Sequence, residues 1–154
     1  MKKVISVILM IVVFASLLAP AAFAVEVPDT GEAKSTTVEY LDDGSYYIIE
    51  VTQLTSVGRS TNTDGYKKAT YHSKDGTAIW TIQLHGFFTY TPGVSAKATS
   101  ASVSVILHDP DASFVSKNAY VSGATAYGST KVKYESVTTS KTVNLTCSTS
   151  GVLS

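Results

Sequence analysis

The chain has 154 residues, with 12 basic and 12 acidic side chains and no formal net charge at pH 7. A chain this close to neutral lacks the basic surface that binding to nucleic acid or to an anionic membrane requires. Its length suits one domain with a two-layer core, and its single cysteine excludes a disulfide within the chain. We therefore expect a domain that is held together by core packing.

The first 24 residues have the order of a secretory signal peptide. Lys2 and Lys3 precede an apolar run over 4–18, and Ala22 and Ala24 supply the small residues of a cleavage site. The run is shorter than the roughly 20 apolar residues of a membrane-spanning helix, and no cysteine for a lipid anchor follows it. Cleavage leaves 130 residues (154 − 24), which carry 10 basic (12 − 2) and 12 acidic side chains. We predict a secreted, extracellular protein without a membrane span.

Residues 25–35 are expected to form a flexible N-terminus of the mature protein, and 36–154 a single domain. The segment 27–31, VPDTG, is similar to the cell-wall sorting pentapeptide of Gram-positive surface proteins. That signal acts near a C-terminus, ahead of an apolar segment and a basic tail. We therefore do not interpret this segment as a sorting signal.

The rest of the chain predicts short strands separated by turns. In chain order, we expect strands over 37–41, 45–54, 67–72, 78–90, 100–107, 113–121, 124–137 and 141–147. Asp42-Asp43-Gly44 and 73–76 are tight-turn sequences, which indicate two hairpins. The segment 59–65 is rich in small polar residues and is expected to be a loop, and a further turn is expected at 108–111.

Alternation is clearest between Ala78 and Tyr90. One predicted face is apolar, and Gly86 within it suggests a bulge or a close backbone approach. The other face is mixed and holds Ile79, Thr81, Gln83, His85, Phe87 and Thr89. Seven or eight such strands, rich in Thr, Val and Tyr, favour an all-β fold. We expect an antiparallel two-sheet sandwich of the immunoglobulin-like class, with a barrel as the alternative.

Several segments carry a resemblance: 41–46 (LDDGSY), 71–81, 86–90 (GFFTY), 100–104 and 142–147 (TVNLTC). Together they resemble a group of small, uncharacterised secreted proteins of Gram-positive, gut-type bacteria. The resemblance implies a signal peptide and a β-rich secreted domain, and it implies no catalytic residues. Members often carry a second cysteine just before the Ser-Ala-Ser-Val stretch, where this chain has Lys97-Ala98-Thr99. The disulfide partner implied for Cys147 is therefore missing.

Cys147 continues the apolar alternation of Val143 and Leu145, which favours a buried thiol that behaves as a small hydrophobe. A leftover cysteine in a secreted chain can also form an intermolecular disulfide, so a Cys147-linked dimer stays open beside the expected monomer. Self-assembly through exposed edge strands is a third alternative.

Each group of residues that could form a catalytic, cofactor or metal site is better explained by a structural role. The three histidines, His72, His85 and His108, have no zinc-ligand spacing, and the segment 109–111 is better explained as a turn than as a calcium loop. The motif G-x-S-x-G is absent, and nothing indicates that Glu50 and Glu135 face one another as glycosidase carboxylates do. We expect no enzyme, cofactor or metal; the alternative is a small secreted hydrolase or effector whose site combines His85, His108, Asp109 and Glu135.

Tyrosine is the remaining functional signal, since the chain has nine. Exposed tyrosines that gather on a sheet face can stack on sugars or bind a protein. We expect a non-enzymatic domain that binds a protein, glycan or envelope partner. The candidate binding face comprises Tyr46, Tyr66, Tyr71, Tyr120 and Tyr127.

Overall fold

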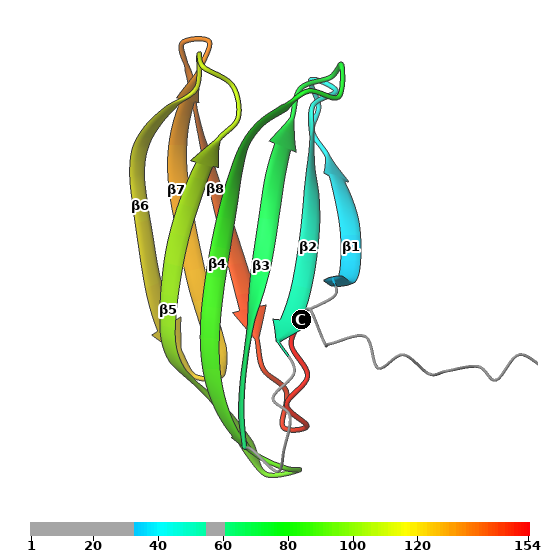
Figure 1. Cartoon of the computed structure of the whole chain (residues 1–154), viewed down its shortest axis with the longest axis vertical. Helices are drawn as coiled ribbons and strands as arrows, with labels where there is room; N and C mark the ends of the chain where they lie inside the picture. The colour runs from blue at the N-terminus through cyan, green and yellow to red at the C-terminus, as the bar shows by residue number, and fades with distance from the viewer. Residues whose placement is uncertain (1–32, 55–60) are drawn as a thin grey trace, which may run out of the picture.

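The computed structural model describes residues 33–54 and 61–154 and shows two β-sheets packed face to face (Figure 1). The strands are β1 (Ala33–Tyr40), β2 (Tyr46–Leu54), β3 (Asn62–His72), β4 (Ala78–Thr91), β5 (Ser95–Leu107), β6 (Ser113–Ser122), β7 (Thr125–Tyr134) and β8 (Val137–Thr146). The described part contains eight strands and no helix, which confirms the predicted all-β, two-layer architecture. The predicted signal peptide over 1–24 and most of the predicted N-terminal segment 25–35 lie outside the described residues.

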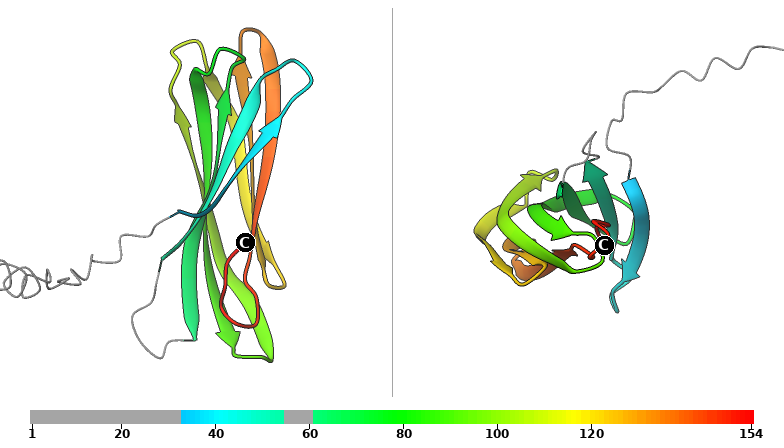
Figure 2. Two further views of the ribbon diagram at one scale, coloured as in Figure 1. Left: turned by 90° about the vertical axis from the view of Figure 1, so that its right-hand side faces the viewer. Right: turned by 90° about the horizontal axis from the view of Figure 1, so that it is seen from below.

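Strand order follows chain order in both sheets. The first sheet has the order β1-β2-β3-β4-β5, the second has the order β6-β7-β8, and every pairing is antiparallel. Immunoglobulin sandwiches use Greek-key connections instead. The described strands form two separate meanders, so they show a two-sheet all-β fold but not the immunoglobulin-like class. Seen along the strands, the larger sheet curves around the smaller one (Figure 2).

The core lies between the two sheets, and β4 contributes most of its bulk. Trp80, Ile82, Leu84 and Phe88 are fully buried on its inner face, as the alternation predicted. The smaller sheet supplies the opposite side of the core with Ala126, Val132, Val143 and Leu145. Burial of each large apolar side chain contributes about 1.5–3 kcal/mol to stability.

A C-terminal segment closes the core at one end. Cys147 and Leu153 form an antiparallel bridge, and Leu153 is buried. The Leu153 side chain packs against Gly65: a Cβ atom added at Gly65 would lie only 2.6 Å from the Leu153 Cδ1 atom. Gln53 fixes the segment from β2: its Nε2 donates to the Gly151 carbonyl at 2.8 Å and its Oε1 accepts from the Leu153 amide at 3.3 Å.

A β-bulge bends the pairing of β4 with β5. Phe87 pairs with Ser100 and Phe88 pairs with Ala98, so Thr99 is an extra residue without a cross-strand partner. The Thr99 hydroxyl donates to the Phe87 carbonyl at 3.1 Å. Gly86 itself pairs regularly with Ala101, so the extra residue lies on β5 and not at the position predicted on β4.

Several strand boundaries differ from the predictions, among them the start of β5 at Ser95, five residues before the strand expected over 100–107. β1 begins at Ala33, four residues before the strand expected from Thr37. β3 begins at Asn62, within the segment predicted to be a loop. The strand expected over 124–137 is interrupted by a two-residue turn, in which Glu135 and Ser136 have φ angles of 47° and 70°. Such turns usually contain Asn-Gly or Asp-Gly, so Glu-Ser gave no turn signal.

Candidate functional site

The strongest candidate site lies on the outer face of the five-stranded sheet. In β3 and β4, Asp64 pairs with Phe87 and Tyr66 pairs with His85. Residues two apart on a strand point to the same side of a sheet, so these four side chains form a block on one face. We call this block the His85 cluster.

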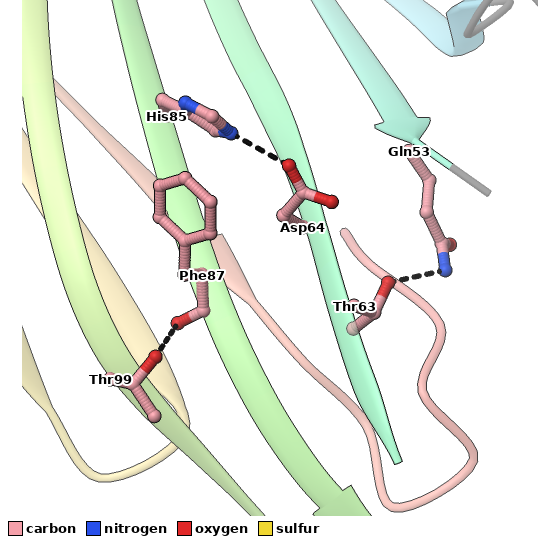
Figure 3. A network of polar contacts seen from close by, with 6 residues as sticks. All are labelled: Gln53, Thr63, Asp64, His85, Phe87 and Thr99. Carbon is pink, nitrogen blue, oxygen red and sulfur yellow. Dashed lines mark hydrogen bonds and ion pairs between the residues drawn. The ribbon is translucent and has the colours of Figure 1, made fainter. Parts of the chain in front are cut away.

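Three rings of the His85 cluster are in contact. The His85 ring stacks on Tyr66 with centroids 4.1 Å apart, and it meets Phe87 at the same distance with a tilt of 41°. Its Nε2 atom lies 2.9 Å from the Asp64 carboxylate (Figure 3). The carboxylate thus orients the imidazole between two aromatic rings, which makes the block a preorganised surface.

A shallow hollow of about 310 Å³ adjoins the His85 cluster. Two residues of the His85 cluster, Asp64 and Phe87, also line this hollow, and Phe87 is 41% exposed. The rest of the lining comprises Asn62, Thr63, Phe88, Thr89 and Thr99. Figure 3 shows Phe87, Thr99 and Asp64 on neighbouring strands of this face. Thr99, which is the extra residue of the bulge in β5, is part of the lining of this hollow. An apolar ring is thus surrounded by hydroxyl and carboxylate groups.

The polar contact of the His85 cluster is a carboxylate–imidazole pair. In residues 33–54 and 61–154, no hydroxyl group hydrogen-bonds to His85, and Asp64 is its polar partner. The block offers aromatic surface and a fixed carboxylate–imidazole pair, which are groups that contact a ligand from outside.

The five predicted tyrosines lie in four different places. Tyr66 belongs to the His85 cluster, whereas Tyr46 stacks on His72 near the opposite end of β3, with centroids 4.9 Å apart. Tyr71 points inward and packs on Tyr47 and Trp80. Tyr120 and Tyr127 stack on each other at 4.8 Å on the outer face of the three-stranded sheet. They do not form one binding face.

The residues of the hydrolase alternative are divided between two regions. His85 lies in the cluster, while Asp109 and Glu135 line a hollow of about 580 Å³ between the loops at the end where His72 lies. The His108 Nε2 atom is 2.8 Å from the Thr81 hydroxyl. Glu50 pairs with Lys68 on the outer face of the five-stranded sheet, whereas Glu135 lies in the turn between β7 and β8, so these two carboxylates do not face one another. The structure therefore does not bring these histidines and carboxylates into one site.

The loop hollow is acidic. Asp43, Asp75, Asp109 and Glu135 line it. Hydrogen bonds from Ser45 lower the pKa of Asp43, and hydrogen bonds from Ser73 and Thr77 lower the pKa of Asp75. Desolvation, with the negative charges of Asp109 and Glu135, raises the pKa of Tyr134. Among the described residues, no group of three or more His, Cys, Asp or Glu side chains is arranged to hold a metal ion.

Cys147 is buried, and its sulfur donates to the Ser148 carbonyl at 3.4 Å. Burial raises the pKa of the thiol, so less thiolate is present at neutral pH. An intermolecular disulfide would require this buried sulfur to become exposed.

Comparisons of the chain with protein-family models, curated proteins and solved structures find no match. In the part of the chain that the structure describes, no helix is long and apolar enough to cross a membrane. The site is therefore interpreted from its own geometry.

Sequence reasoning missed two members of the His85 cluster. Asp64 fell in a predicted loop, and Phe87 was placed on the mixed face of its strand without a function. The alternation did place His85 and Phe87 on the same face. The cross-strand register that brings Asp64 and Tyr66 beside them was the missing information.

Proposed function

We propose that this protein is a secreted, non-enzymatic domain that binds a glycan through the His85 cluster. The observation that carries the proposal is the exposed Phe87 ring, which is held against His85 and adjoins a hollow lined by Asp64, Thr89 and Thr99. A pyranose has an apolar face that stacks on an aromatic ring and hydroxyl groups at its edge that need hydrogen-bond partners. Open β-sheet faces are known to bind oligosaccharides in other folds.

The surroundings of the cluster favour a glycan over a protein. Protein interfaces have a desolvated apolar centre. Here the apolar groups of the outer face are interrupted by a charged and polar row across the sheet, formed by Glu50, Lys68, Gln83 and Ser104. On β5, Ser100 and Ser102 lie opposite Phe87 and His85 and add exposed hydroxyl groups.

Two further observations support a binding domain outside the cell. The leader over 1–24 predicts that the protein is exported from the cell. Outside the cell, glycans of the bacterial envelope and of host mucus are available as ligands. Of the residues of the hydrolase alternative, His85 lies in the His85 cluster, Asp109 and Glu135 line the loop hollow, and His108 contacts Thr81.

The test measures retention of the purified protein on peptidoglycan, on a wall-polysaccharide fraction and on a panel of immobilised mucin oligosaccharides. We expect retention on at least one of these, and we expect Phe87→Ala to weaken it about tenfold, since loss of one stacking contact removes about 1.4 kcal/mol. Phe114→Ala is the matched control, because Phe114 is 49% exposed but lies on β6 in the other sheet.

Retention that Phe114→Ala weakens as much as Phe87→Ala would assign the binding to another surface. No retention on any of the glycans would overturn the proposal.

A further inference from the structure

A second feature, independent of the His85 cluster, is the free edge of the five-stranded sheet. β1 pairs with β2 on one side and with no described strand on the other. Figure 1 shows it at the border of the sheet. An unpaired edge presents a row of amide and carbonyl groups that can bind another strand.

The register shows which residues of β1 present these groups. The Leu41 amide donates to the Ser45 carbonyl at 2.9 Å, so these two residues form a hydrogen-bonded pair. Bonded and non-bonded pairs alternate along an antiparallel ladder. Glu39 and Thr37 therefore bond to β2, while Thr36, Val38 and Tyr40 direct their backbone groups away from the sheet.

On its outer side, the stretch from Thr36 to Tyr40 carries no lysine and no proline. Edge strands are commonly blocked by an outward lysine, a proline or a bulge. Between Thr36 and Tyr40, the outward side chains are uncharged, and Val38 and Tyr40 are 48% and 75% exposed. Glu39, the charged residue of this stretch, points inward and forms an ion pair with Lys141 at 2.7 Å.

The other edges are less open. β6 carries an exposed lysine, Lys117, and a bulge between Phe114 and Ser116. β1 also has a bulge, between Ala33 and Ser35, but it lies before the stretch from Thr36 to Tyr40. On the β5 edge, the Ala98 amide is already bonded to the Gly123 carbonyl. Thr146, at the end of β8, exchanges two backbone hydrogen bonds with Ser154. β1 is thus the edge best suited to accept a strand.

We propose that β1 pairs with β1 of a second copy of the chain, antiparallel and with the two-fold axis at Val38. This register joins two five-stranded sheets into one. It places Val38 opposite its own counterpart and Thr36 opposite Tyr40 of the second copy, which are favourable β-branched and aromatic–β-branched pairs. Glu39 lies opposite Thr37 of the second copy, so no like charges meet. The contact is self-complementary, as a two-fold dimer requires.

The test is sedimentation of the purified protein over a range of concentrations. We expect a monomer–dimer equilibrium that reductant does not change, because the contact does not involve Cys147. Val38→Lys and Val38→Glu should each weaken the dimer about a hundredfold, since two like charges then face each other at the axis. An equal mixture of the two variants should form a heterodimer, identified by its mass in native mass spectrometry.

Ser140→Lys is the control, because Ser140 is exposed on β8, the edge strand of the other sheet. This variant should dimerise as the unchanged protein does. A monomer at every concentration would overturn the proposal, as would a dimer that survives Val38→Lys, a dimer that Ser140→Lys disrupts, or a variant mixture that stays monomeric. Formation of the heterodimer also shows that both variants are folded.

Discussion

The two faces of the five-stranded sheet place adjacent, identical residues in opposite environments. Phe88 is buried on the inner face of β4, where its ring covers Gly86; atoms Cε2 and Cζ lie 2.8 Å from the position of a Cβ atom there. Phe87 points outward and contacts His85 with an exposed ring. The inner face stabilises the fold and the outer face carries the binding site that we propose, although one strand supplies both.

The two faces also differ in how tightly they are constrained. On the inner face, backbone and side-chain atoms leave no space beside Gly65 or Gly86. On the outer face, the His85 cluster is held by one hydrogen bond and two ring contacts. Substitutions on the inner face should therefore change the free energy of unfolding, and those on the outer face should change binding.

The largest effect is expected from Phe88→Ala. Removal of a buried phenylalanine side chain costs about 3–5 kcal/mol, because it removes apolar contacts and leaves a cavity. Phe87→Ala should cost about 1 kcal/mol or less, since only an exposed ring contact is lost. Chemical denaturation of both variants measures the difference, and equal losses would contradict the assignment of the two faces.

A smaller loss is expected from Gly65→Ala. The new methyl group would lie 2.4 Å from the Thr52 carbonyl oxygen and 2.6 Å from the Leu153 side chain, so the backbone must shift. Overpacking of this kind costs about 2 kcal/mol. Gly123→Asn is the control, because no atom lies within 4 Å of the added Cβ position and asparagine tolerates its positive φ of 57°. A melting temperature unchanged in Gly65→Ala would show that the C-terminal segment does not pack there.

The smallest effect, and the one with opposite sign, is expected from Tyr47→Phe. Among the described side chains, the Tyr47 hydroxyl is buried without a hydrogen-bond partner, and burial raises the pKa of this phenol. Its removal should raise the free energy of unfolding by about 1 kcal/mol. Tyr46→Phe, on the outer face, should change stability by less than about 0.5 kcal/mol. A destabilised Tyr47→Phe variant would indicate that the hydroxyl group has a partner in solution.

The strands were predictable where one face is buried. From Ala78 to Tyr90, alternation identified the inner residues correctly, and the turns at Asp43 and Asp75 were marked by Asp-Gly. The start of β3 was not predictable, because Asn62 and Asp64 disfavour strands and are held there by pairing with β4. The connectivity also lay beyond local pattern, since alternation does not reveal which strands are neighbours.

The candidate site was predictable only in part. Residue type alone grouped Tyr46, Tyr71 and Tyr127, which the register places on three different surfaces. Tyr66 belongs to the His85 cluster, but its neighbours His85 and Phe87 come from the next strand. A binding face on a sheet depends on pairing between strands, so no single segment of the sequence contains it.

Trp80 gives the molecule an internal fluorescent reporter. It is the one tryptophan of the chain, it is fully buried, and its ring contacts Tyr47 and Tyr71 in the core. Its emission will therefore follow the separation of the two sheets on unfolding. The ligand and the second copy that we propose would bind the outer face and the edge, away from Trp80, so we expect this signal to report folding separately from association.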